Sequence, residues 1–175
     1  LNAAFGSGMY VFPGGKVEAG DGVDADLAHR LAAIRECFEE AGVLLARTAE
    51  GEHVSDGHPV LDARTQVHDG TVDLVSLCDL HELVPAVDEL VWVSHWITPR
   101  GEGRRFDTRF YVAPAPAEQS SAHDDHETIA SLWVDPAARG QGLARRLMRR
   151  LEDEARALGH TSLKLDTNEN LPEAI

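Results

Sequence analysis

The sequence predicts an α/β domain, because segments of helix character alternate with segments of strand character along the chain. The segment that ends at Ala41 places large apolar side chains at intervals of three and four between a capping aspartate, Asp24 or Asp26, and Gly42, which predicts a helix with one buried face. Residues 91–98 and 106–113 predict two strands joined by a turn. The expected buried face of the helix consists of Leu27, Leu31, Ile34 and Phe38.

Shorter segments connect and flank these elements. Residues 9–12 predict a strand that ends at a Pro-Gly-Gly turn. Three further segments follow in order: an irregular polar stretch at 47–70, a short helix at 74–83 and a polar loop at 113–127. The three tryptophans fall at expected strand positions, where we favour core packing over a ligand platform: Trp92, Trp96 and Trp133. The two cysteines, Cys37 and Cys78, are expected to be apolar filling.

Composition excludes several classes of protein. The 175 residues carry a formal charge of −14, so nucleic-acid binding through bulk charge is not expected. The 43% hydrophobic content favours a packed core over disorder. No apolar run approaches the roughly 20 residues of a membrane helix, and no leader precedes the first turn. We therefore expect a cytoplasmic protein without a membrane anchor.

The charge divides the chain into two parts. Residues 1–130 hold 9 basic and 23 acidic side chains, whereas residues 131–175 hold 7 of each. Such a step predicts a boundary between two units, 1–130 and 131–175. The chain begins with Leu1 and stops at Ile175 in an expected helical turn, so we expect both ends to be cut.

Three glutamates on the first helix predict a metal site. Glu36, Glu39 and Glu40 are three or four residues apart or adjacent, so their carboxylates lie close together on a helix. Like charges at this spacing repel one another, and a hard divalent cation such as Mg²⁺ or Mn²⁺ would relieve the repulsion. The alternative is an ordinary solvated helix face.

The surrounding residues resemble the Nudix box, Gly-x5-Glu-x7-Arg-Glu-U-x-Glu-Glu-x-Gly-U, where U is a large aliphatic residue. Gly15 and the run Arg35 to Val43 match, Asp21 stands in place of the first Glu, and 13 residues instead of seven separate it from Arg35. The resemblance implies a Nudix-type mixed sheet between helices, with the N-terminal strand of that sheet missing from this chain. It also implies that Glu36, Glu39, Glu40 and the Gly15 carbonyl bind Mg²⁺ or Mn²⁺, and that Arg35 orients the cluster.

Residues 5–134 resemble the Nudix branch of peroxisomal and mitochondrial coenzyme A diphosphatases. The likeness rests on Phe-Pro-Gly-Gly at 12–15, His-Trp-Ile-Thr-Pro at 95–99 and Arg-Arg-Phe-Asp-Thr-Arg-Phe at 104–110. It implies a pyrophosphate substrate, with CoA or acyl-CoA as candidates. Glu127 is our candidate for the base or a further metal ligand, with Arg35, Glu36 and Glu39 as the other catalytic residues. The candidates for phosphate binding are Arg104, Arg105 and Arg109, whose alternative role is a charged hairpin surface.

The last quarter resembles another family. A strand, a glycine-rich loop and a long helix at 132–158 resemble the acetyl-CoA loop of GNAT acetyltransferases, in which backbone N–H groups approach a pyrophosphate. The residues implied in acetyl-CoA binding are Arg139, Gly140, Gln141, Gly142, Leu143 and Ala144. Only about 45 residues of such a domain are present.

Three functions therefore compete. The first is a metal-dependent Nudix pyrophosphohydrolase of a nucleoside diphosphate-linked substrate. The second is a GNAT-type N-acetyltransferase or an acetyl-CoA-binding remnant. The third is an inactive fusion fragment with an open sheet edge.

Overall fold

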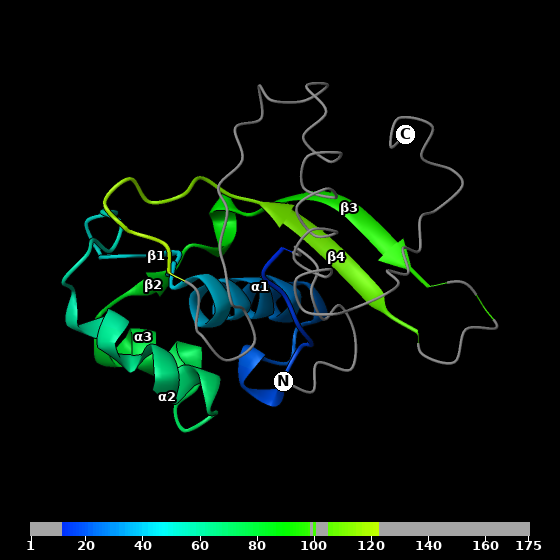
Figure 1. Cartoon of the computed structure of the whole chain (residues 1–175), viewed down its shortest axis with the longest axis horizontal. Coiled ribbons are helices and arrows are strands. Elements are labelled where there is room, and N and C mark those ends of the chain that lie inside the picture. Colours follow the sequence, from blue (N-terminus) through cyan, green and yellow to red (C-terminus); the bar gives the residue numbers. More distant parts are fainter. Residues whose placement is uncertain (1–11, 99, 101–104, 123–175) are drawn as a thin grey trace, which may run out of the picture. The chain divides into compact units, whose positions relative to one another are not determined.

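The computed structural model describes residues 12–98, 100 and 105–122 (Figure 1). Residues 9–11 of the strand expected at 9–12, Trp133 and the elements expected in 132–166 lie outside the described residues, and Phe12 is described but is not in a strand. The elements are, in chain order, η1 (Ala19–Asp21), α1 (Ala25–Ala41), β1 (Ala46–Arg47), η2 (Pro59–Ala63), α2 (Arg64–His68), α3 (Leu74–Leu80), β2 (Val84–Pro85), η3 (Val87–Glu89), β3 (Val91–Ile97) and β4 (Asp107–Val112).

Helix α1 begins and ends where the sequence predicts. The Asp24 carboxylate accepts the N–H of Leu27 at 2.9 Å and caps the first turn. Gly42 adopts a left-handed φ of 71° and donates its N–H to the Phe38 carbonyl, which ends the helix.

The buried face of α1 is shorter than expected. Leu31, Ile34 and Phe38 are buried as predicted, but Leu27 is 41% exposed. The main apolar cluster begins at Ile34, so the first turn of α1 extends beyond the cluster and leaves Leu27 in solvent.

The segment expected to be irregular at 47–70 is partly helical, and this prediction was wrong. It contains η2 and α2, which bury Val60, Ala63 and Val67 against the core that also includes Phe38. The intervals of three and four between these buried residues are a helical pattern. Each of the two elements spans only five residues, too few for periodicity to stand out among polar neighbours.

Within the part of the chain that the structure describes, the strands form two separate two-stranded antiparallel sheets. Strand β1 pairs with β2, and β3 pairs with β4 as the expected hairpin. Helix α1 contacts both β4 and α2, and α3 follows α2 in the chain (Figure 1). The α/β class is confirmed.

The tryptophans of the hairpin do not fill the core. Trp92 is 47% exposed and Trp96 is 49% exposed, so the expected core role was wrong for both. Both faces of a two-stranded hairpin are short of packing partners, whereas a strand inside a larger layered sheet is covered.

Hydrogen bonds between side chains and the backbone attach the polar segment after β4 to the rest of the domain. The Gln119 amide accepts the N–H of Leu44 and donates to the carbonyls of Leu44 and Val54. The Asp56 carboxylate accepts the N–H and hydroxyl of Ser120, which holds the pKa of Asp56 below its usual value. The loop is therefore irregular in secondary structure but firmly attached.

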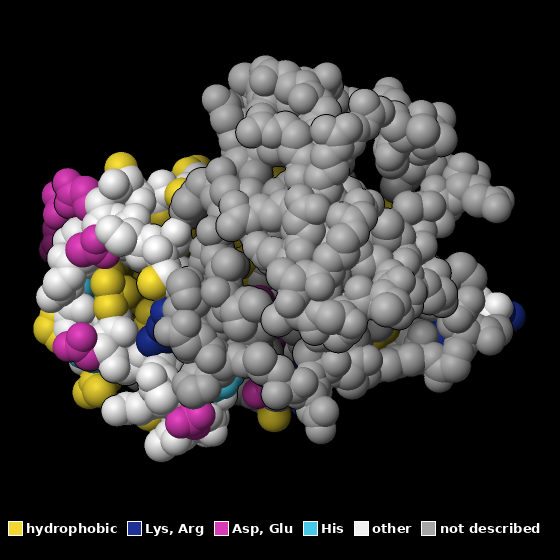
Figure 2. Space-filling view, viewed as in Figure 1, with side chains coloured by type: hydrophobic (Ala, Val, Ile, Leu, Met, Phe, Trp, Pro, Cys, Tyr) yellow, Lys and Arg dark blue, Asp and Glu magenta, His cyan; other side chains and the backbone are white. Residues whose placement is uncertain are grey.

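The described surface carries acidic side chains at several separate places (Figure 2), in keeping with the excess of acidic residues in the first part of the chain. Among residues 12–98, 100 and 105–122, no helix is both long and apolar enough to cross a membrane.

Candidate functional site

The C-terminal half of α1 carries a group of buried charges. Arg35, Glu36 and Glu39 are each less than 10% exposed, and Asp21 of η1 is 2% exposed. Charged side chains are rarely so deeply buried unless they are paired. The resemblance to the Nudix box singled out all four positions.

Arg35 lies at the centre of this group and pairs with three carboxylates. Its Nε donates to Asp21 Oδ1 at 3.0 Å, and its Nη1 donates to Glu36 Oε1 at 2.9 Å and to Glu39 Oε1 at 3.1 Å. Its Nη2 donates to the Lys16 carbonyl at 2.8 Å. A planar guanidinium has donors in several fixed directions, so one residue can join the loop at 16–21 to two turns of α1.

The surrounding acids keep Arg35 charged. Burial alone would lower the pKa of the guanidinium, but the hydrogen bond to Asp21 and the nearby Glu36 and Glu39 carboxylates raise it. The site therefore contains a permanent cation that offsets part of the repulsion among the carboxylates.

Asp21 performs the pairing that the Nudix pattern usually gives to a glutamate. Its two oxygens contact Arg35 at 3.0 and 3.3 Å, and Oδ2 also accepts the N–H of Glu18 at 2.7 Å. The shorter side chain still reaches Arg35 because η1 places residue 21 close to the helix. The six-residue insertion between Asp21 and Arg35 is thus compatible with the ion pair.

Gly15 lies directly against Glu36. A Cβ atom added at Gly15 would overlap Oε1 of Glu36 and come within 2.8 Å of Oε2, so only glycine fits without displacing the carboxylate. Next to it, the N–H of Gly14 donates to Glu40 Oε2 at 3.0 Å. The Gly-Gly turn therefore brings the backbone close to two of the three glutamates.

The end of α1 that bears the glutamates is capped by distant residues. Arg64 of α2 donates its Nε to the Glu39 carbonyl at 2.9 Å, and the N–H of Ala122 donates to the Ala41 carbonyl at 2.9 Å. Carbonyls at a helix C-terminus lack helical partners, and a cation there complements the helix dipole. Sequence reasoning missed Arg64, because no local pattern links a residue of α2 to α1.

Cys37 stands beside the glutamates but is not a reactive thiol. Burial, with a contribution from the Glu40 charge, raises the pKa of Cys37 to about 11. A thiol with so high a pKa is neutral near neutral pH, in agreement with an apolar filling role.

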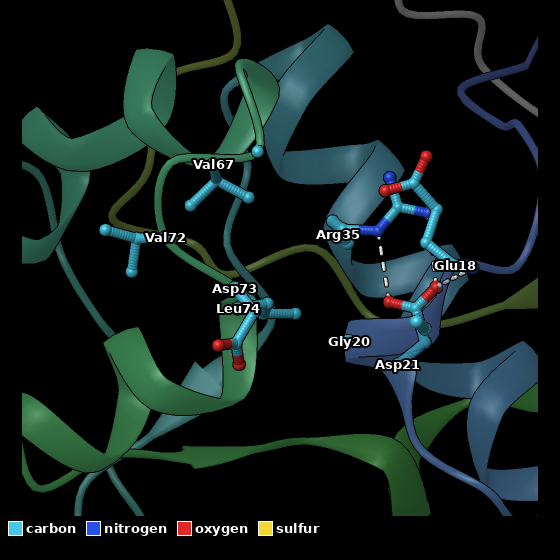
Figure 3. Close-up of a pocket in the computed structure, with 10 residues that line it drawn as sticks. Glu18, Gly20, Asp21, Arg35, Val67, Val72, Asp73 and Leu74 are labelled. Atoms are coloured by element: carbon cyan, nitrogen blue, oxygen red, sulfur yellow. Dashed lines mark hydrogen bonds and ion pairs between the residues drawn. The ribbon is translucent and has the colours of Figure 1, made fainter.

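A cavity of about 180 Å³ borders the Arg35–Asp21 pair (Figure 3). In Figure 3, Arg35 and Asp21 lie on one side, and Val67, Val72 and Leu74 lie on the other. The Asp73 carboxylate at its edge accepts the N–H and hydroxyl of Ser76 and so caps α3. The cavity separates the ion pair from the α2–α3 segment.

The donor atoms suit a hard divalent cation, although the described residues do not form a complete metal site. Among residues 12–98, 100 and 105–122, no three His, Cys, Asp or Glu side chains are arranged to hold a metal ion. Oxygen donors of Glu36, Glu39 and Glu40 are nonetheless the ligands that Mg²⁺ prefers. On this chemistry the residues fit Mg²⁺ or Mn²⁺.

The other predicted site residues divide into two groups. Arg109 pairs with Asp26 at 3.0 Å in the first turn of α1, and Arg105 donates to the Thr98 carbonyl within the hairpin. Their role in phosphate binding stays a prediction. The remaining candidates lie outside the described residues: Arg104, Glu127, Arg139, Gly140, Gln141, Gly142, Leu143 and Ala144.

The α/β fold and the Arg35-centred cluster define a domain of the Nudix type. A family model described as the NUDT19 Nudix domain matches residues 10–146, and the chain belongs to this family. The domain boundary expected at residue 130 stays a prediction.

Known proteins agree with this assignment. The chain is 32% identical over 149 residues to the acyl-coenzyme A diphosphatase NUDT19 of Gallus gallus, covering 75% of this chain and 39% of that protein. The chain thus spans well under half the length of the curated relatives it matches first. A crystal structure of a NUDIX hydrolase from Alicyclobacillus acidocaldarius shares the fold, with a TM-score of 0.64, 24% identity and coverage of 82% of this chain and 67% of that one.

A further relative concerns the acetyltransferase resemblance. The chain is 31% identical over 123 residues to an uncharacterized N-acetyltransferase of Azospirillum brasilense, covering 56% of this chain and 73% of that protein. The residues expected to bind acetyl-CoA lie outside those described, so their role stays a prediction.

Proposed function

We propose that the chain is a divalent-metal-dependent hydrolase that cleaves the pyrophosphate bond of a nucleoside diphosphate-linked substrate, with CoA or acyl-CoA as the candidates. The observation that carries the proposal is the pairing of Arg35 with Asp21, Glu36 and Glu39 beside Gly15. The name of the Gallus gallus relative supports a CoA-type substrate.

Hydrolysis of the pyrophosphate bond needs only the substrate and one water molecule as reactants. Water adds to one phosphorus, the bond from that phosphorus to the bridging oxygen breaks, and the other phosphate leaves with the bridging oxygen. A bound Mg²⁺ or Mn²⁺ would supply positive charge to the phosphate oxygens. Cleavage of CoA at this bond yields phosphopantetheine and 3′,5′-ADP.

The chain's own residues hold the site in place. Arg35 fixes the carboxylates of Glu36 and Glu39 by hydrogen bonds from a single nitrogen, which keeps both ionised oxygens in a defined position. The Gly14 N–H orients Glu40 in the same way. Arg64 and Ala122 fix the helix end that bears these side chains.

Glu127 is the proposed acceptor of the proton released by the attacking water. Ala122 is bonded to Ala41 at the end of α1, so the chain five residues before Glu127 is fixed beside the glutamates. Five residues span at most about 17 Å when extended. Arg104, Arg105 and Arg109 are the proposed cationic partners of the substrate phosphates.

The test is a hydrolysis assay with the full chain. CoA, acetyl-CoA and ADP-ribose are incubated with Mg²⁺ or Mn²⁺, and the products are separated by chromatography. We expect metal-dependent release of phosphopantetheine or its acyl form, and a loss of about a hundredfold or more for Glu40→Gln. Glu50→Gln, which changes an exposed glutamate, is the matched control. Equal activity of the two variants would contradict the role of Glu40.

An acetyltransferase is the second candidate function, favoured by the likeness to the Azospirillum brasilense protein. Transfer of the acetyl group to an amine would leave CoA intact with a free thiol, whereas pyrophosphate cleavage would split CoA. Chromatography of the same reactions with an added amine therefore separates the two. If neither product forms, the chain is the inactive fragment of the third hypothesis. The cytoplasmic location stays a proposal.

A further inference from the structure

The last turn of α1 obtains its hydrogen-bond donors from segments that are far away in the chain. The last four carbonyls of a helix have no partner within the helix. The Glu39 carbonyl accepts Nε of Arg64 at 2.9 Å, and the Ala41 carbonyl accepts the N–H of Ala122 at 2.9 Å. The turn that carries the second and third glutamates is therefore closed from outside the helix.

Apolar packing holds Arg64 at this place. Arg64 is the first residue of α2, and it lies between Ala63 and Val67, which are buried in the apolar cluster that contains Phe38 of α1. Phe38 directly precedes Glu39 in the chain. The packing of α2 against α1 therefore also brings the Arg64 side chain to the Glu39 carbonyl.

The guanidinium of Arg64 lies against Gly42, the residue that ends α1. A Cβ atom added at Gly42 would lie 3.0 Å from Nη1 and 3.4 Å from Cζ of Arg64. The carbonyl end of a helix is the negative end of its dipole, so a cation is favourable there. Arg64 thus supplies both a donor and a positive charge to the end of α1.

Glu39 is held by one arginine at its side chain and by another at its backbone. Arg35 Nη1 donates to Glu39 Oε1 at 3.1 Å, whereas Arg64 holds the carbonyl of the same residue. The position of a carboxylate depends on its backbone as well as on its rotamer. A change in the last turn would therefore move the carboxylates of Glu39 and Glu40 together.

We propose that Arg64 is a positioning residue of the metal site, which holds the last turn of α1 so that Glu39 and Glu40 meet the divalent cation in a fixed arrangement. This inference rests on the proposed function, since it assigns a support to the same site. Arg64 acts through the helix backbone, and groups that orient ligands in this way typically change metal affinity by about ten- to a hundredfold.

The charge of Arg64 would have the opposite effect on the metal. A positive charge near the site repels a second cation, so if charge were its main influence, its removal would tighten metal binding. If Arg64 positions the glutamates, its removal weakens metal binding. The sign of the change in metal affinity therefore separates the two roles.

The test compares Arg64→Met with Arg64→Gln in the full chain. Both variants remove the charge and keep the stem, but the Gln amide nitrogen stands where arginine has Nε and can still donate to the Glu39 carbonyl. Electron paramagnetic resonance measures the Kd for Mn²⁺ without substrate. We expect Kd to rise about tenfold for Arg64→Met and to stay near the parent value for Arg64→Gln. Unchanged or tighter binding by Arg64→Met would overturn the proposal, and so would equal weakening in both variants.

A control variant tests for a general loss of structure. Arg47 is a half-buried arginine of β1 that pairs with Asp88 and Glu89 of η3, and Arg47→Met should leave the Kd for Mn²⁺ unchanged. Each variant is measured below its thermal unfolding midpoint, determined by circular dichroism. If Arg47→Met weakens Mn²⁺ binding as much as Arg64→Met, the positioning role is overturned.

Metal binding also separates this inference from the proposed function. If the parent binds Mn²⁺, Arg64→Met binds it about tenfold more weakly and no substrate is hydrolysed, the positioning role stands and the hydrolase proposal fails. If substrate is hydrolysed but Arg64→Met binds Mn²⁺ as the parent does, the hydrolase stands and the positioning role is overturned. A parent chain that binds no Mn²⁺ would overturn the positioning role as well.

Discussion

The two halves of α1 face opposite kinds of environment. The C-terminal half buries charge, because Arg35, Glu36 and Glu39 are less than 10% exposed and bonded to one another. The N-terminal half meets the β3–β4 hairpin through Asp26 and Arg109, where the aromatic side chains are half-exposed. One helix thus joins a buried polar centre to an exposed aromatic surface.

The difference lies in how each region is held. Around Arg35, the contacts are hydrogen bonds of 2.8 to 3.3 Å in a site of low exposure, where an unpaired charge is costly. On the hairpin, the ion pair of Asp26 with Arg109 involves an aspartate side chain that is 54% exposed, and such pairs contribute little. We therefore expect the surroundings of Arg35 to be rigid and intolerant of substitution. We expect the β3–β4 hairpin to tolerate substitution.

The largest effect is expected at Arg35. Arg35→Ala leaves Asp21 and Glu39 buried without their cation, so we expect a loss of about 3–5 kcal/mol in the free energy of unfolding. Urea denaturation measures it, with Arg100→Ala at an exposed arginine as control. Equal losses for the two variants would show that the buried network contributes nothing.

Gly15→Ala should act on activity more than on folding. The new methyl group would displace the Glu36 carboxylate, and we expect a fall of about ten- to a hundredfold in metal affinity or kcat/KM. At neighbouring Gly14 an added Cβ meets its nearest neighbour at 3.9 Å and the N–H to Glu40 is kept, so Gly14→Ala should lose much less. Steady-state kinetics across a metal titration compares the two, and a similar loss in both would contradict the steric argument.

Asp21→Glu tests whether the box accepts the residue that the family pattern favours. Asp21 is 2% exposed and both of its oxygens are bonded, so an extra methylene should cost about 1–3 kcal/mol of stability. Thermal unfolding checks this against Asp62→Glu, which lengthens an exposed aspartate. A gain in stability from Asp21→Glu would mean that the loop adapts freely.

The smallest effect is expected at Asp26, and it should depend on pH. The hydrogen bond from Arg30 is the main cause that lowers the pKa of Asp26 below 3.8. A lowered pKa means that the stabilisation is present above 3.8 and is lost as the pH falls through the folded-state value. Asp26→Asn should therefore melt slightly below the parent at neutral pH, and the two should converge only when the pH falls below the lowered pKa of Asp26 in the folded state. A difference that widens in acid would refute the assignment.

The sequence predicted local features well where the signal was local. The stop at Gly42 and the hairpin depend on neighbouring residues and were confirmed, and of the two candidate caps, Asp24 and Asp26, the structure has Asp24. The grouping of Arg35, Glu36 and Glu39 followed from spacing on one helix and from the resemblance to the Nudix box. The small helices η2 and α2 were missed, because each is too short for a clear periodic pattern.

Contacts between segments that are far apart in the chain could not be predicted from the sequence. The hydrogen bond from Arg64 to the Glu39 carbonyl joins residues that are 25 positions apart. The hydrogen bond between Leu44 and Gln119 joins residues that are 75 positions apart. The exposure of Trp92 and Trp96 was also missed, since their strand positions alone do not say what covers them.

By itself, the sequence determined the α/β class, the bounds of α1, the three glutamates and the arginine that accompanies them, because helix geometry fixes which of these residues are neighbours. Only the tertiary structure decided that Asp21 reaches Arg35 despite the insertion, that Gly15 touches Glu36, and that Arg64 reaches the Glu39 carbonyl. These contacts depend on how separate segments pack in three dimensions, and local propensities along the chain do not encode that packing.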